Sequence, residues 1–238
     1  SLTITGNAIF NGAVTGVTNL SVSGTTSLGA DITTTGTQTY IGAFTISGGD
    51  RVLTATGNAI LFSSTINSDA TLTPRSLTIS AGAGNTTFSG AVGASYALNA
   101  LTVNGTVTIG DNITTAGAQN YTGNVIISGS NVNLSSMGNS GTGATITFGG
   151  NIDGSVADSN NLYLLSGAGE TSVAGNVGNT TGLAYLALGG YGAYTSPVAQ
   201  NFSYTGSVQS YTAPTAGTYT LQTWGAQGGS AAMATNLT

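Results

Sequence analysis

Two 29-residue segments of this chain are versions of one another. Residues 20–48 align without a gap on residues 101–129 at a constant offset of 81, and fifteen of the 29 positions are identical. A shorter echo at an offset of 85 relates residues 82–84 to residues 167–169, both of them Gly-Ala-Gly. Self-similarity at a fixed spacing is typical of elongated stacks in which each unit packs on its neighbours. The repeat therefore favours stalks, fibres and adhesive surfaces over enzymes.

Each copy of the repeat is made of short runs in which apolar and polar residues alternate. Leu20-Ser-Val22 and Leu101-Thr-Val103 are examples. Alternation at a period of two, with many β-branched residues, indicates strands that bury one face. The runs are separated by Gly, Asn, Asp or Ser, which favour turns. The 38 glycines of the chain further disfavour helices.

Short strands at regular spacing are compatible with a sandwich, a barrel or a solenoid, and the internal repeat favours the solenoid. We expect residues 1–190 to form an all-β parallel β-helix with units of about 80 residues, each built from about four coils of roughly 20 residues. Leu, Ile, Val and Phe would stack in a narrow core. Thr and Asn would form polar ladders on the outside that keep the protein soluble without charge.

The composition changes near residue 190, and residues 191–238 are predicted to be a separate cap or assembly module. Residues 202–211 and 217–224 predict two longer strands of an aromatic β-hairpin or small β-sandwich. Such a cap would cover the last coil, because an open edge promotes aggregation. Aromatic residues gather in this region. Because aromatic residues are enriched in binding hot spots, they form either a partner contact or the packing of the hairpin itself. The candidate contact residues are Tyr204, Tyr211, Tyr219 and Trp224.

Charged and chemically reactive residues are scarce. The chain has two Arg, no Lys and seven acidic residues, for a net charge of −5, and it has neither Cys nor His. The charge argues against nucleic acid and against anionic membrane surfaces. Disulfides, thiolate metal sites and Ser-His-Asp or Cys nucleophiles are excluded. We therefore predict no enzyme activity, no cofactor and no catalytic or metal-binding residue.

The acidic residues are interpreted mainly as turn-forming residues. Asp153 and Asp158 bracket a short loop and could share a cation, although calcium prefers six to eight oxygen ligands and turn formation is the favoured interpretation. Asp50 beside Arg51 is interpreted as a turn or a solvated surface pair. Glu170, which stands where the earlier copy has Asn85, is assigned to a turn.

Targeting signals are not visible in the sequence. No stretch approaches the ~20 apolar residues of a membrane span, and no signal peptide is recognisable. The chain begins with Ser1 rather than Met. We expect a processed chain or a segment of a longer one.

One motif within the repeat carries a family resemblance. Residues 32–42 and 113–123 share the pattern Ile-Thr-Thr-x-Gly-x-Gln-x-Tyr-x-Gly. This pattern resembles the repeats of filamentous haemagglutinin-type bacterial adhesins, over roughly residues 1–190. The resemblance implies a right-handed parallel β-helix, export across the outer membrane and a role as an extended surface shaft. Residues 202–229 resemble the start of a glycine-rich module found in large extracellular proteins.

Together these observations predict a non-enzymatic structural protein, extracellular or on the bacterial cell surface. It would be the β-solenoid shaft of an adhesin or the subunit of a self-assembling filament, joined head to tail through an exposed first strand in residues 1–10. Expected partners are further copies of the chain, neighbouring segments of a larger adhesin, and a glycan or host surface. The alternative is a β-helix that binds or cleaves carbohydrate, with Tyr121 or Tyr163 in an outer groove.

Overall fold

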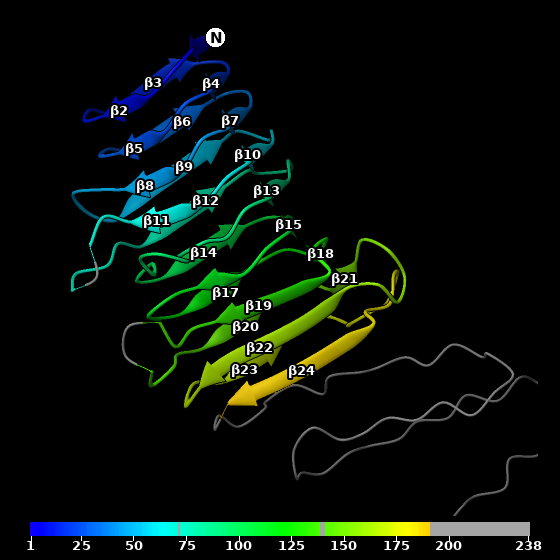
Figure 1. Ribbon diagram of the computed structural model, residues 1–238. Helices are drawn as coiled ribbons and strands as arrows, with labels where there is room; N and C mark the ends of the chain where they lie inside the picture. The colour runs from blue at the N-terminus through cyan, green and yellow to red at the C-terminus, as the bar shows by residue number, and fades with distance from the viewer. Residues whose placement is uncertain (71, 139–140, 191–238) are drawn as a thin grey trace, which may run out of the picture.

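The computed structural model describes residues 1–70, 72–138 and 141–190 of the 238-residue chain. Within these residues the regular structure is entirely β-strand, and every paired strand runs parallel to its partner. Successive turns of the chain stack from the N-terminus, in blue, to the last described strand, in yellow (Figure 1). The chain is therefore a β-solenoid of about eight turns, which confirms the all-β parallel fold. The handedness stays a prediction implied by the resemblance.

Each turn contributes strands to three sheets, here called faces A, B and C. Face A consists of β1 (Leu2–Ile4), β4 (Leu20–Val22), β7 (Gln38–Tyr40), β10 (Ile60–Phe62), β13 (Thr86–Phe88), β15 (Val107–Ile109), β18 (Val125–Ile127) and β21 (Ile152–Gly154). Face B consists of β2 (Ala8–Phe10), β5 (Thr26–Leu28), β8 (Phe44–Ile46), β11 (Ile66–Ser68), β16 (Ile113–Thr114), β19 (Asn131–Ser135), β22 (Asn161–Gly167) and β24 (Tyr185–Gly190). Face C consists of β3 (Val14–Val17), β6 (Ile32–Thr34), β9 (Arg51–Ala55), β12 (Leu77–Ser80), β14 (Leu101–Asn104), β17 (Gln119–Tyr121), β20 (Ile146–Phe148) and β23 (Thr171–Val173).

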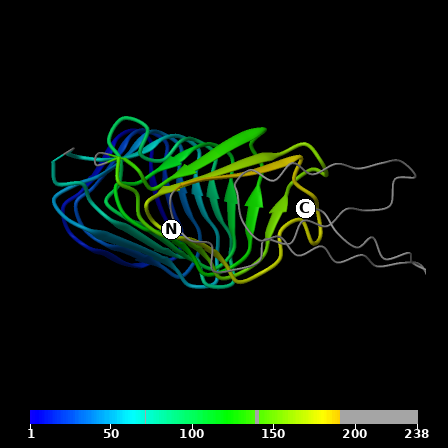
Figure 2. The same ribbon diagram turned by 90° about the horizontal axis from the view of Figure 1, so that it is seen from below.

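The order of strands within each face follows the chain, so each turn lies between the preceding and the following one. Face B is continuous because isolated bridges of Val92 connect β11 to β16 in the fifth turn. Figure 2, seen from below, shows the strands of successive turns overlapping along one axis.

Strand β14 shows how the alternating sequence separates the core side of a strand from its outer side. Leu101 and Val103 are fully buried, whereas Thr102 between them faces outward. Its neighbour across the ladder is Thr78 of β12. Inward apolar residues thus form the core and outward Thr residues form a polar row, as the period of two predicts.

The Gly-Ala-Gly echo forms the same tight corner twice. Gly82 and Gly167 both have a φ of +60°, a left-handed conformation that favours glycine. Gly84 donates a hydrogen bond to the Ala81 carbonyl at 2.9 Å. A Cβ on Gly82 would lie 2.7 Å from the backbone nitrogen of Gly57 in the preceding turn. Glycine is needed at this corner for both its backbone conformation and its lack of a side chain.

The 81-residue repeat does not return to the same face. Leu20 lies in β4 on face A, whereas its counterpart Leu101 lies in β14 on face C. The expected count of about four coils per unit is close, but the unit spans three complete turns and two further strand positions. The element that the sequence repeats is therefore the strand with its corner, and it serves on different faces.

The length of a turn varies mainly at the corners. Leu20 pairs with Gln38, 18 residues later, whereas Ile60 pairs with Thr86, 26 residues later. The longer turns carry loops between faces B and C, for example between β11 and β12 and between β19 and β20. Strand register is maintained on either side of these loops.

The core is one column of buried side chains that runs through the stack. Leu, Ile and Val dominate it, and aromatic rings of neighbouring turns stack on one another. Phe62 lies between Tyr40 and Phe88, with ring centroids 5.2 and 5.6 Å away. A second stack joins Tyr121 to Phe148 at 5.2 Å. The predicted apolar column is confirmed, with two buried tyrosines added to it.

Candidate functional site

The predicted aromatic contact site lies outside the described residues. Tyr204, Tyr211, Tyr219 and Trp224 all belong to residues 191–238, and so do the hairpin and the cap expected there. These assignments stay predictions. The candidate sites that follow belong to the solenoid.

Carboxylates in the solenoid accept hydrogen bonds from the backbone of the next turn. Asp31 Oδ1 accepts from the Val52 amide at 2.9 Å, and Asp50 Oδ1 accepts from the Ser76 amide at 2.7 Å. Each of these bonds joins one turn to the following one at a corner. The two side chains thus hold the stack together, in line with the turn assignment for Asp50.

The two arginines make different contacts. Arg51 does not reach the carboxylate of Asp50 but donates to its carbonyl at 2.9 Å and to the carbonyl of Ser47 at 2.8 Å. Arg75 forms an ion pair with Asp69, with Nε and Oδ1 2.9 Å apart. Burial acts to raise the pKa of Asp69, but hydrogen bonds from the Gly48 amide and Arg75 outweigh it and hold that pKa below its ordinary value.

Of the acidic pair considered for a cation, Asp153 uses its carboxylate and Asp158 uses its backbone amide to bond to the backbone of the following loop. Asp153 Oδ1 accepts hydrogen bonds from the amides of Thr180 and Thr181 at 2.8 and 3.2 Å. Asp158 has a φ of +53°, and its amide donates to the Gly182 carbonyl at 3.1 Å. In the part of the chain that the structure describes, no three His, Cys, Asp or Glu residues gather into a possible metal site.

The motif behind the family resemblance forms a buried polar corner. Tyr121 Oη donates to Gln119 Oε1 at 2.8 Å, and Gln119 Nε2 donates to Thr115 Oγ1 at 3.2 Å and to the Ser135 carbonyl at 2.9 Å. The Thr115 hydroxyl in turn donates to the Gly117 carbonyl at 2.6 Å. Gln119, Tyr121 and Thr115 are fully buried. The corner therefore holds a polar network inside the apolar column.

The first copy of the motif repeats this network almost bond for bond. Tyr40 Oη donates to Gln38 Oε1 at 2.9 Å, and Gln38 Nε2 reaches Thr34 Oγ1 at 3.2 Å and the Thr54 carbonyl at 2.8 Å. Burial raises the pKa of both tyrosines well above the ordinary value. These networks were not predicted from the sequence, although Gln38 and Tyr40 lie an even number of residues from Thr34 and therefore point inward with it.

The burial of Tyr121 overturns one sequence-based expectation. Its side chain has no exposed surface, so its placement in an outer groove that binds carbohydrate is wrong. Tyr40 and Tyr121 are components of the core, where their hydroxyls satisfy the glutamine side chains. Tyr163, the other residue named for that groove, does lie on the outside of face B, in β22.

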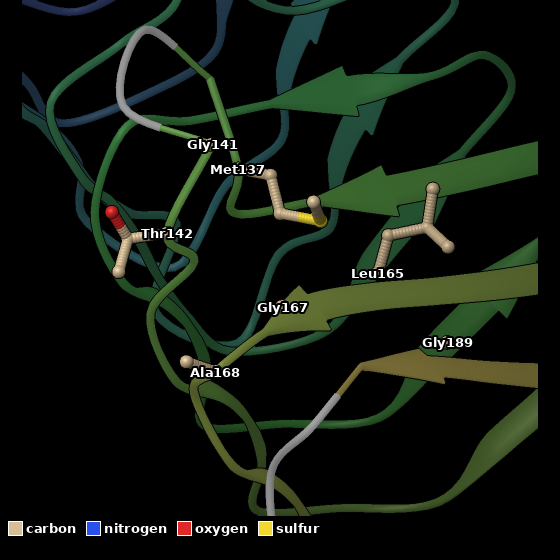
Figure 3. Close-up of a pocket in the computed structure, with 7 residues that line it drawn as sticks. All are labelled: Met137, Gly141, Thr142, Leu165, Gly167, Ala168 and Gly189. Carbon is tan, nitrogen blue, oxygen red and sulfur yellow. The ribbon is translucent and has the colours of Figure 1, made fainter.

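One hollow lies beside the last described turns. It has a volume of about 460 Å³ and its wall carries no ionisable side chain. Figure 3 shows Met137 and Leu165 together with Thr142, Ala168 and glycines around the hollow. A second hollow of about 360 Å³ includes Asp153 as its one ionisable residue. That carboxylate already accepts two backbone amides. The first hollow is lined by Met137, Gly141, Thr142, Leu165, Gly167, Ala168 and Gly189.

The outside of face B broadens over its last three strands, β19, β22 and β24. Strand register places Asn161 between Asn131 and Tyr185, and places Tyr163 between Asn133 and Ala187. The rings of Tyr163 and Tyr185 lie 5.6 Å apart between centroids, at 51° to one another. We call Asn131, Asn133, Asn161, Tyr163 and Tyr185 the Tyr–Asn face.

Comparison with known proteins adds no family assignment. No protein-family model matches the chain, and neither a curated protein nor a solved structure matches it. No helix long and apolar enough to cross a membrane is found among the residues described. The proposals below therefore depend on the solenoid and its surfaces.

Proposed function

We propose that this chain is a non-enzymatic structural protein at the bacterial cell surface, either the stiff shaft of an adhesin or the subunit of a self-assembling filament. The observation that carries the proposal is the stack of eight turns around one continuous apolar column. In such a stack each turn contacts only its neighbours, so length is gained by adding turns without a change in the core. This architecture suits a spacer that holds a partner at a distance.

Stiffness is supported by hydrogen bonds that run along the axis. The strand ladders connect each turn to the next on all three faces. Asparagine side chains add bonds at the corners: Asn124 Oδ1 accepts the Asn151 amide at 3.0 Å, and Asn151 Oδ1 accepts the Asn176 amide at 2.9 Å. Bending the shaft would stretch ladders on one face, which opposes the motion.

The exterior suits an exposed structure in changing media. Outward positions of the ladders are mainly hydroxyls and amides, such as Thr78, Thr102 and Asn120 along face C. With nine ionisable side chains of Arg, Asp and Glu in 238 residues, few interactions are subject to salt screening. We expect its shape to respond little to ionic strength.

The filament form of the proposal is supported by the edge at the first turn. The amides of Leu2 and Ala8 donate to the second turn. In a parallel ladder the backbone groups of alternate residues point to opposite sides, so those of Thr3 and Ile9 point away from the second turn. Ile9 is 71 % exposed. Such an edge can accept a strand of another copy in a head-to-tail contact that need not close.

Electron microscopy of the native material tests the proposal. Long, uniform fibres would support the filament subunit, and isolated rods would support the shaft segment. Compact particles without an elongated axis would contradict both. For the filament, deletion of residues 1–10 removes β1 and β2 and should abolish assembly, so intact fibres from that deletion would exclude the head-to-tail contact.

A further inference from the structure

We propose that the Tyr–Asn face binds a neutral saccharide, whose rings lie on Tyr163 and Tyr185 and whose hydroxyls bond to the neighbouring asparagine amides. The site lies on the outside of β19, β22 and β24 and does not depend on the shaft function proposed above. We propose a binding site only, because none of the five residues of the Tyr–Asn face is one of the carboxylates that glycoside cleavage needs.

The two tyrosines form an accessible aromatic platform. Tyr185 is 50 % exposed, and Tyr163 is partly exposed beside it. Their positions on adjacent strands set the ring centroids 5.6 Å apart. The register partner of Tyr163 on β24, the strand that also carries Tyr185, is Ala187, whose small side chain leaves that flank of the ring open. Tyr side chains provide apolar contact area together with a hydroxyl that remains in water, which matches the mixed surface of a sugar ring.

The asparagines beside the platform are already held in place. Asn161 Nδ2 donates to Asn131 Oδ1 at 2.8 Å, and Asn133 Nδ2 donates to Asn112 Oδ1 at 3.0 Å. A carboxamide has two N–H donors and two acceptor lone pairs, so each amide retains hydrogen-bonding capacity after these bonds. Groups that are fixed before binding lose less conformational entropy when a ligand arrives. The amides can therefore donate to and accept from sugar hydroxyls.

The absence of charge selects a neutral ligand. The Tyr–Asn face consists of tyrosine and asparagine side chains and includes no Arg, Lys, Asp or Glu. The two arginines of the chain lie elsewhere, Arg51 in β9 on face C and Arg75 in the loop before β12. An acidic polysaccharide would find no cation to pair with its carboxylates, whereas a neutral one needs none.

Titration of the full 238-residue chain with oligosaccharides tests the proposal. The probes are the hexasaccharides of β-1,4-linked glucose and of β-1,4-linked N-acetylglucosamine, with the hexamer of galacturonic acid as the acidic comparison. We expect at least one neutral probe to bind at millimolar concentration, and more tightly than the acidic probe. Calorimetry gives the affinity. Failure of both neutral probes to bind, or tighter binding of the acidic one, would overturn the proposal.

Variants localise the site. Tyr163→Ala should weaken binding about tenfold or more, the loss expected when an aromatic hot spot is truncated. Ala187→Gln should also weaken it, by covering the open flank of Tyr163 while both rings remain. Tyr96→Ala is the matched control, because Tyr96 is 46 % exposed in the loop between β13 and β14 and bonds through its backbone to β11, well before β19, β22 and β24 in the stack. It should bind like the parent.

The same variants distinguish a saccharide from a second copy of the chain. Unchanged affinity in both Tyr163→Ala and Ala187→Gln would overturn the assignment. Sedimentation of each variant without sugar reports self-association. If Tyr163→Ala abolishes self-association and leaves sugar binding unchanged, the Tyr–Asn face is an interface between copies, and the saccharide proposal is wrong.

Discussion

The buried polar corner at Gln119 and Tyr121 should respond sharply to the loss of a single atom. Tyr121→Phe removes the hydroxyl that donates to Gln119 Oε1 at 2.8 Å, and it leaves that oxygen buried without its donor. A buried polar group left unsatisfied costs about 1–3 kcal/mol. Gln119→Leu should cost a similar amount, because it leaves the Tyr121 hydroxyl without its acceptor. The double variant removes both partners and should be less destabilised than the sum of the two single variants.

Local hydrogen exchange is the suitable assay, because the stability of a solenoid is distributed over its turns and a global midpoint can miss a local change. At about 1.4 kcal/mol for each factor of ten, Tyr121→Phe should accelerate exchange in β17 by about 5- to 150-fold. Tyr163→Phe, the same substitution on the outside, should change stability by less than about 0.5 kcal/mol. A Tyr121→Phe effect as small as that, or strictly additive single effects, would refute the polar-corner argument.

Two further predictions concern the buried tyrosines and the glycine corners. Burial raises the folded-state pKa of Tyr40 and Tyr121 above the unfolded value of about 10. Their contribution to stability is therefore complete below pH 10, and above it the free energy of unfolding falls by about 1.4 kcal/mol per pH unit for each tyrosine. Urea unfolding between pH 9 and 12 measures this slope, and a flat profile would contradict it. Gly82→Ala should lower the free energy of unfolding by about 2 kcal/mol or more, because this position combines a φ of +60° with a close backbone contact. Gly12→Ala, with nothing within 4 Å of the added Cβ, should be nearly neutral. Equal unfolding midpoints for the two variants would show that the corner does not require glycine.

Much of the fold follows from local patterns in the sequence. The alternation in segments such as Leu101-Thr-Val103 predicts both the strand and its buried face, and the repeat predicts the stack. Partner strands could not be assigned in the same way. The repeat aligns Leu20 with Leu101, yet these residues lie on different faces, because three complete turns and two further strand positions separate them.

The surfaces were less predictable for a related reason. Tyr121 and Tyr163 look equivalent as isolated tyrosines, but the first points inward and the second outward. Parity along one strand indicates this difference only when the inward residues of that strand are already known. The Tyr–Asn face joins residues of three strands whose paired positions are 24 to 30 residues apart in the sequence, so its composition becomes visible only once strand register is known.

Two threonines of the second turn test whether strands on different faces can carry each other's residues. Thr26 is buried in β5, and its hydroxyl has no hydrogen-bond partner among the described residues. Its counterpart in the repeat is Val107 in β15, on another face. Val has nearly the same shape as Thr, so Thr26→Val should remove a buried unsatisfied hydroxyl without leaving a cavity, and should stabilise the chain by about 1 kcal/mol.

Thr34 is the matched control for that substitution. It is buried to the same extent in β6, but its hydroxyl donates to the Gly36 carbonyl at 2.8 Å and accepts from Gln38 Nε2 at 3.2 Å. Thr34→Val should therefore destabilise the chain by about 1–3 kcal/mol. The same chemical change in one turn should thus have opposite signs, measurable as local hydrogen exchange in β5 and β6. If both variants were destabilised alike, side-chain shape rather than hydrogen bonding would decide which residues each strand position accepts.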